Sequence, residues 1–329
     1  MKAPFPYFGG KSRVAAEVWK RFGDPKNYVE PFAGSLAVLL SRPTAPKIET
    51  INDADCYLSN FWRSVQAAPE EVAEWANWPV NEADLSARHL WLLQYRPLRV
   101  QADPDYYDAK IAGWWLWGVC AWIGSGFCSG KGPWQSIDGE LSDVRKLPHL
   151  GNAGLGINRK LPHLGDAGRG INRQLPRLGN AGQGINHEHA FETRGDYIRS
   201  IMLELSSRLR DVRIACGDWS RVVSKTVTSG LGERCVFLDP PYSADYCGGL
   251  YQSDDKSIAK NAAKWAVEHG DDPKMKIALC GYEGEHEMPS DWECFAWRGG
   301  GYGAGCGAAG DANRRKERIW FSPGCEVSA

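Results

Sequence analysis

The hydrophobic positions near the start of the chain follow the order helix, strand, helix, strand, helix. Val14, Val18 and Phe22 have helical spacing, and an apolar strand at Tyr28–Val29 then runs into a turn that ends at Gly34. Strands that alternate with helices in this way are typical of a parallel sheet. The other elements predicted here are a helix over 35–40, a strand over 48–51 ending in Asn52-Asp53, and a helix with Leu58, Phe61, Trp62 and Val65 on one side.

The pattern becomes helical and rich in aromatic residues over residues 62–134, with no clear strand. Ile111, Trp115 and Trp122 recur at helical spacing, which favours a buried helix face over a surface on which bases stack. We therefore predict a separate helical lobe over residues 62–145.

A basic, self-similar tract follows the lobe. A unit of 14 residues that begins at Lys146 occurs twice, and a looser third copy covers 174–187. Pro and Gly in every copy favour stacked turns or loops, because the period is too short for helical solenoids. From Arg145 to His187, seven Lys or Arg residues stand against one acid, Asp166, so we treat 146–189 as a basic insertion. Phosphate contact, a solvated charged surface and a tolerated surface insertion all fit this tract.

The alternating strand and helix pattern returns after residue 190. Residues 1–61 and 190–329 are together predicted to form one α/β domain with a sheet of about seven mostly parallel strands. The predicted elements are a helix with Tyr197 to Leu209, strands over 212–216 and 236–238, a helix over 257–269, a strand over 277–279, and two closing strands at Phe295 and 319–321 joined by the Gly-rich stretch 299–310.

Composition and charge exclude several classes of protein. Apolar residues make up 43% and charged residues 24%, which excludes wholesale disorder, collagen and coiled coil. The net charge is -1, so any nucleic-acid surface must be a local patch. The ten cysteines form no C-x-x-C pair, and we predict no metal. The longest apolar stretch, 111–123, is shorter than the roughly 20 residues of a membrane span, so we predict a cytoplasmic protein without membrane association.

The turn after the first strand is a candidate site for a nucleotide-type cofactor. Gly34 lets the backbone approach a ligand, and Asp53 lies 19 residues on, at the end of the next strand, where an acid can accept hydrogen bonds from ribose hydroxyls. Leu36 occupies the place of a second glycine, which favours a cofactor with ribose but without a pyrophosphate. The alternative interpretation is an ordinary tight turn with Asp53 as a helix N-cap.

Asp239-Pro240-Pro241-Tyr242 is the second candidate site. The prolines have no N–H, so the segment after the strand is stiff and presents carbonyl oxygens beside the Asp239 carboxylate. An amino group on an aromatic ring is a weak nucleophile, because its lone pair is delocalised. Acceptors at Asp239 and Pro240 favour a pyramidal nitrogen and orient it for in-line attack, while Tyr242 offers a stacking surface. A rigid corner with a surface tyrosine is the alternative interpretation.

Several motifs in order resemble those of Dam-type DNA adenine N6-methyltransferases, especially phage-encoded ones. The resemblance covers about residues 1–65 and 190–323, and it implies a Rossmann-like methyltransferase sheet with an inserted helical target-recognition lobe. Tyr7 stands where many members have tryptophan, and Leu36 replaces the second glycine of the family's cofactor loop. The motifs are Pro6-Tyr7-Phe8-Gly9-Gly10-Lys11, Glu30-Pro31-Phe32-Ala33-Gly34, Asn52-Asp53, Cys216-Gly217-Asp218 and Asp239-Pro240-Pro241-Tyr242.

The resemblance implies a bacterial or phage-encoded enzyme, a site-specific adenine DNA-methyltransferase, in the context of phage DNA or of restriction-modification. It transfers a methyl group from S-adenosylmethionine to N6 of a flipped-out adenine in double-stranded DNA. Two alternatives are a methyltransferase for an exocyclic amine in structured RNA and a catalytically idle DNA-binding relative. The implied cofactor-binding residues are Tyr7, Gly10, Lys11, Glu30, Phe32, Gly34, Asp53, Asp218 and Asp239; the catalytic ones are Asp239, Pro240 and Tyr242; and the DNA-binding ones are Lys131, Arg314, Arg315 and Lys316.

Overall fold

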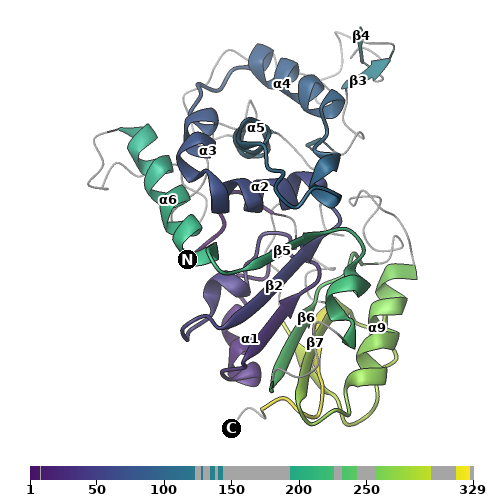
Figure 1. Cartoon of the computed structure of the whole chain (residues 1–329). Coiled ribbons are helices and arrows are strands. Elements are labelled where there is room, and N and C mark those ends of the chain that lie inside the picture. Colours follow the sequence, from purple (N-terminus) through teal and green to yellow (C-terminus); the bar gives the residue numbers. More distant parts are fainter. Residues whose placement is uncertain are drawn as a thin grey trace, which may run out of the picture.

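The predicted α/β architecture is confirmed by a seven-stranded sheet. The computed structural model describes residues 1–7, 9–122, 127–128, 134–137, 140–143, 193–225, 232–242, 257–297 and 316–326. The sheet has the strand order β5-β2-β1-β6-β7-β9-β8 (Figure 1). Its strands are β1 (Asn27–Glu30), β2 (Ile48–Asp53), β5 (Arg213–Cys216), β6 (Arg234–Leu238), β7 (Met275–Tyr282), β8 (Glu293–Ala296) and β9 (Glu317–Phe321).

Most of the sheet is parallel, and its strand order reverses once at the centre. Strands β5, β2, β1, β6 and β7 are parallel, whereas β9 runs antiparallel between β7 and β8. The order turns back between β1 and β6. In open α/β sheets, ligands bind beyond the carboxyl ends of the strands at such a switch point. The residues that follow Glu30 and Leu238 therefore lie where a cofactor is expected.

Helices cover both faces of this sheet, which explains the continuous apolar runs in the strands β6 and β7. Successive residues of β1 face opposite ways: Tyr28 packs in the core that contains α1 (Ala15–Phe22), and Val29 packs in the core that contains α9 (Ser257–His269). Figure 1 shows these two helices at opposite sides of the sheet. Every residue of β6 and β7 is buried.

The predicted helical region lies beyond one edge of the sheet (Figure 1). Ile111 and Trp115 of its central helix are buried, as the periodicity predicted. Gln66 Nε2 donates to Leu209 O at 2.6 Å, which ties the helix after β2 to the helix before β5. The elements are α2 (Cys56–Ala67), α3 (Pro69–Ala76), α4 (Glu82–Gln94), α5 (Ala109–Ala121) and α6 (Arg194–Leu209), with 3-10 turns η1 (Leu39–Ser41), η2 (Leu98–Gln101) and η3 (Trp219–Val223) and the hairpin strands β3 (Trp134–Ile137) and β4 (Glu140–Asp143).

The helix predicted over 35–40 is wrong. Only the short turn η1 forms there, because Gly34 and Leu36 have left-handed backbone angles with φ of 47° and 55°. Two such residues prevent a right-handed helix from starting after the turn. Leu36 is nevertheless fully buried, so its apolar character serves core packing from a loop. The repeats and the Gly-rich stretch 299–310 lie outside the described residues.

Candidate active site

Lys11 is a buried lysine that links the amino-terminal motif to Asp239. It ends the loop before α1, and its carbonyl accepts from the amides of Val14 and Ala15 as that helix begins. Its side chain is 4% exposed, and its Nζ atom lies 2.8 Å from Asp239 Oδ2. The same ammonium donates to Gly9 O at 2.9 Å. Two motifs that are far apart in the sequence therefore meet in one ion pair.

The electrostatics of this pair keep Lys11 charged. Burial alone opposes the ammonium, but the negative carboxylates of Asp239 and Glu317 outweigh it and raise the Lys11 pKa above its ordinary value. Asp239 itself is partly accessible, with its side chain 21% exposed. The pair is thus a charged lysine that is shielded from water beside a carboxylate that a ligand can reach.

Tyr242 completes the Asp-Pro-Pro-Tyr corner with a buried ring. Its hydroxyl donates to Asp239 Oδ1 at 3.3 Å. The centroid of the Tyr242 ring lies 4.6 Å from the centroid of the Tyr282 ring and 5.2 Å from Lys11 Nζ. Pro240, whose carbonyl group was predicted to accept a hydrogen bond, is buried. At this corner, the Asp239 carboxylate therefore lies beside the aromatic ring of Tyr242.

Glu317 is an acidic residue of this site that sequence reasoning missed. It is the first residue of β9, opposite Tyr282 in the sheet register, and its Oε2 lies 3.9 Å from Lys11 Nζ. Burial is the main cause that raises the pKa of Glu317, with Asp239 adding to it, whereas Lys11 and a side-chain hydrogen bond with Tyr242 oppose it. The available signal was an acid directly after Arg314, Arg315 and Lys316, which the resemblance implies as DNA-binding residues, and just before a predicted strand.

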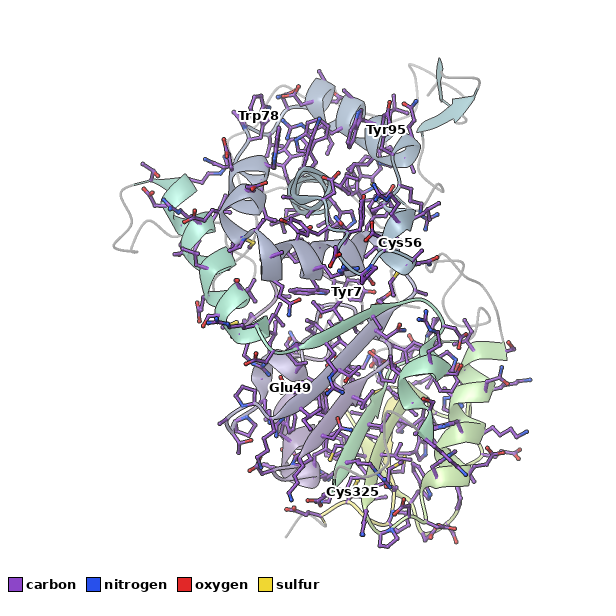
Figure 2. All side chains as sticks on the ribbon, in the orientation of Figure 1. Tyr7, Glu49, Cys56, Trp78, Tyr95 and Cys325 are labelled. Atoms are coloured by element: carbon purple, nitrogen blue, oxygen red, sulfur yellow. The ribbon has the colours of Figure 1, made fainter. Side chains whose placement is uncertain are left out.

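The turn at Gly34 is closely packed against Tyr7. A Cβ atom at Gly34 would lie 2.6 Å from Tyr7 Cε1, so only glycine fits under this ring. Figure 2 shows Tyr7 between the helices of the lobe and the sheet. The turn is fixed on both sides, because Gly34 N donates to Asp53 Oδ2 at 2.9 Å and Trp62 Nε1 donates to Gly34 O at 3.1 Å. The predicted cofactor turn is therefore rigid.

Asp53 holds the ends of β1 and β2 together through backbone donors. Its second oxygen accepts from Asp55 N at 2.8 Å, and burial raises its pKa to about 6 with help from the nearby Asp55 charge. The side chain that caps α2 is Asp55, which accepts from Tyr57 N. Asp53 is therefore not the N-cap of this helix.

Asp218 and Phe32 lie at the ends of β5 and β1. Asp218 is exposed and caps η3 by accepting from Ser220 N at 2.9 Å. Phe32 stacks on Trp219, with ring centroids 5.7 Å apart and an interplanar angle of 30°. Asn52 bridges these ends, because its Nδ2 donates to the carbonyls of Pro31 and Gly217, each at 3.0 Å. Trp219 is a further aromatic residue of this region that the motif before it did not predict.

Glu30, predicted to bind the cofactor, points into the core. It is 2% exposed, and its Oε2 accepts from Tyr28 OH at 3.0 Å and from Leu39 N at 3.3 Å. Burial is the largest cause that raises its pKa to about 8. Burial therefore disfavours the ionised form of Glu30, and its contacts are with Tyr28 and Leu39 of the protein itself.

The predicted DNA-binding residues are described only in part. Lys131, Arg314 and Arg315 lie outside the described residues. Lys316 is exposed directly before β9, so it lies at the same edge of the sheet as Asp239. No cluster of three or more His, Cys, Asp or Glu side chains suited to a metal ion occurs among the described residues. None of the helices in this part of the chain is both long and apolar enough to span a membrane.

Comparison with known proteins confirms the predicted family resemblance for the amino-terminal part. Residues 7–85 match the family model of the D12 class N6 adenine-specific DNA methyltransferases. This family consists of enzymes that methylate adenine in DNA with S-adenosylmethionine as donor, and the prediction of an adenine-specific DNA methyltransferase is confirmed at that level. The matched segment contains the Lys11 motif, the Gly34 turn and Asp53. No curated protein matched the chain.

Proposed function

We propose that the chain transfers a methyl group from S-adenosylmethionine to N6 of an adenine flipped out of double-stranded DNA, by direct in-line attack. The observation that carries the proposal is the distance of 2.8 Å between Lys11 Nζ and Asp239 Oδ2. It joins the amino-terminal motif to the Asp-Pro-Pro-Tyr corner at the switch point of the sheet. The cofactor turn and the acceptor corner thus border one site.

The residues at the ends of β1, β2 and β5 fit S-adenosylmethionine. Two places offer an apolar surface for the planar base of the cofactor. One is the ring of Tyr7, which packs against the Gly34 turn, and the other is the stacked pair of Phe32 and Trp219. A carboxylate has about four lone-pair positions, so Asp53 can accept from ribose hydroxyls while it holds the Gly34 amide. Asp218 offers a further carboxylate, which unlike that of Asp53 is exposed. When bound, the cofactor supplies an electrophilic methyl group on a sulfonium.

The Asp-Pro-Pro-Tyr corner fits the amine that accepts the methyl group. The Asp239 carboxylate and the Pro240 carbonyl each accept a hydrogen bond from the amino group. These two hydrogen bonds orient the nitrogen lone pair toward the methyl group. Tyr242 lies beside Asp239 as a surface for a flipped base. Base flipping costs a few kcal/mol, which phosphate contacts help offset. Lys316 is a basic side chain at this edge that suits such a contact.

Asp239→Asn and Asp239→Ala test the proposal. We expect methyl transfer to unmethylated duplex DNA to fall by about 100-fold or more, since an oriented polar group of this kind contributes that much. Cofactor affinity should be retained at least in part. Asp272→Asn is the matched control, because Asp272 precedes β7 at the opposite edge of the sheet, where it pairs with Arg234.

Unchanged transfer by the Asp239 variants would refute the assigned role. Parallel assays with labelled cofactor on duplex DNA and structured RNA identify the acceptor. Incorporation into RNA alone would favour the RNA enzyme, and incorporation into neither would favour the idle DNA-binding relative.

A further inference from the structure

Glu317 carries a buried carboxylate oxygen for which the motifs provide no role. Because β9 runs antiparallel to β7, its first residue lies at the edge of the sheet where Asp239 follows β6. Glu317 is 8% exposed, and its Oε2 has no hydrogen-bond donor among the described residues. A buried oxygen without a donor is costly. A donor that reaches it during the reaction would remove this cost.

The Lys11 ammonium is in position to be that donor. It lies 3.9 Å from Glu317 Oε2 while it contacts Asp239 and Gly9 O. An ammonium has three N–H donors. A shift of about 1 Å toward Glu317 would produce an ordinary charge-assisted hydrogen bond. Lys11 thus has two neighbouring anionic positions, only one of which is within hydrogen-bond distance.

Asp239 is already engaged on both oxygens before any amine binds. Oδ2 contacts the Lys11 ammonium at 2.8 Å, and Oδ1 accepts from the Tyr242 hydroxyl at 3.3 Å. A buried ammonium is a much stronger competitor for a carboxylate than a neutral amino group. An amine that needs Asp239 as its acceptor must therefore displace Lys11 or share the carboxylate with it.

We infer that Glu317 is a positioning residue, which accepts the Lys11 ammonium when the target amine occupies Asp239. The inference rests on the proposed function, in which Asp239 accepts a hydrogen from that amine. Glu317 keeps the buried ammonium neutralised throughout the exchange, so Lys11 need not enter water. It acts through Lys11 and does not itself touch the reacting atoms.

Glu317→Gln tests the inference, because it removes the charge and retains the size of the side chain. We expect kcat for duplex DNA to fall about tenfold or more, within the range of coupling between contacting residues, while the cofactor Kd changes little. The matched control is Glu283→Gln, which removes a neighbouring carboxylate that pairs with Arg318 and has a side chain 62% exposed. An unchanged kcat in Glu317→Gln would overturn the inference.

A merely structural role predicts different results. Glu317 would then affect the melting temperature and the amount of folded enzyme, without changing kcat per folded molecule. Glu317→Asp keeps the charge on a shorter side chain and should recover part of the kcat lost in Glu317→Gln. If Glu317→Gln does not fold, Glu317→Asp is tested in its place. The inference would be overturned if Glu317→Asp had the kcat of the wild type and if Lys11→Met lowered kcat by the same factor in both backgrounds.

A double-mutant cycle tests whether Glu317 acts through Lys11. Single-turnover methyl transfer is measured for Lys11→Met, Glu317→Gln and the double variant. We expect Glu317→Gln to have no further effect once Lys11 is methionine. An equal additional loss in that background would contradict the inference.

Asp239→Asn separates this inference from the proposed function. If Asp239→Asn retains transfer, the role proposed for Asp239 fails, whatever Glu317 does, whereas the proposed function itself fails if the unsubstituted chain transfers no methyl group to DNA. If Asp239→Asn is inactive while Glu317→Gln keeps the wild-type kcat, only the role assigned to Glu317 fails.

Discussion

The two halves of the candidate site hold their carboxylates in different ways. In the cofactor half, Asp53 and Asp218 accept from backbone amides of neighbouring turns. In the amine half, Asp239 and Glu317 face the side chains of Lys11 and Tyr242. Backbone donors are fixed by the fold, whereas side-chain donors can change partners. The comparison supports the proposal of a rigid frame for the cofactor next to an adjustable charge cluster for the acceptor.

Lys11→Met is expected to have the largest effect. It should also distinguish the two halves of the site most clearly, because it affects methyl transfer more than cofactor binding. It leaves the Asp239 carboxylate without its ammonium, so we expect transfer to fall by about 100-fold. Unfolding free energy should fall by up to about 3 kcal/mol, because one partner of a buried pair is lost. Cofactor affinity should fall by much less than transfer. Equal losses of affinity and transfer, measured by titration and by labelled-methyl assay, would remove the distinction between the halves.

Gly34→Ala tests the rigidity of the cofactor half. The new Cβ would lie 2.6 Å from the Tyr7 ring at a φ of +47°. Left-handed backbone and overpacking together should lower the free energy of unfolding by about 2–4 kcal/mol. Cofactor affinity should fall as well. Adding Tyr7→Leu removes the steric part and should restore some stability, which denaturant unfolding measures; no recovery would contradict close packing as the cause.

Glu30→Gln tests whether the Glu30 side chain binds the cofactor or only packs in the core of the protein. The Glu30 pKa is raised from 4.5 to about 8, so the folded state binds the proton more tightly than the unfolded state. Wild-type stability should therefore fall as pH rises through this interval, by up to about 1.4 kcal/mol per pH unit. Glutamine stays neutral and keeps an acceptor for Tyr28 and Leu39, so this slope should be absent.

The measurement for Glu30 is urea unfolding of both proteins at two pH values within that interval, together with cofactor titration. Parallel stability curves would show that the buried carboxyl does not titrate as expected. A large loss of cofactor affinity would return Glu30 to the set of ligand-binding residues.

Asp218→Ser is expected to have the smallest effect. Serine also serves as an N-cap, so η3 should keep its start and stability should change by no more than about 0.5 kcal/mol. Loss of the carboxylate should weaken cofactor binding by about 3- to 10-fold, the value of one hydrogen bond. Asp108→Ser is the control, because Asp108 caps α5 through Ile111 N in the lobe. Equal cofactor affinity in both variants would restrict Asp218 to capping.

The sheet was largely predictable because its strands are apolar runs that end in polar or glycine residues. The segment before Asp239 is buried on both faces and appears in the sequence as a short apolar run. The segment before Asn52-Asp53 is also buried, although Glu49 and Thr50 stand between its two isoleucines. The pattern over 35–40 misled because Leu36 is buried from a left-handed loop position, which hydrophobic spacing cannot distinguish from a helix.

The site was predictable where it depends on local motifs and unpredictable where it depends on long-range placement. Lys11 and Asp239 stood in motifs of their own, although their mutual contact did not follow from spacing. Glu317 was hidden in a charged run, because only the insertion of β9 between β7 and β8 turns this acid toward the site. Glu30 is the opposite case, because its motif suggested a residue that binds the cofactor, whereas its side chain faces the core.

The antiparallel strand β9 also affects when the enzyme becomes competent during synthesis. Lys11 emerges from the ribosome long before its second carboxylate partner, Glu317, because most of the described sheet lies between them in the sequence. Contacts of such long sequence separation form late, after costly loop closure. A nascent chain can thus build much of its core while its buried ammonium still awaits the second of its two partners, which delays the assembled charge cluster until β9 has been made.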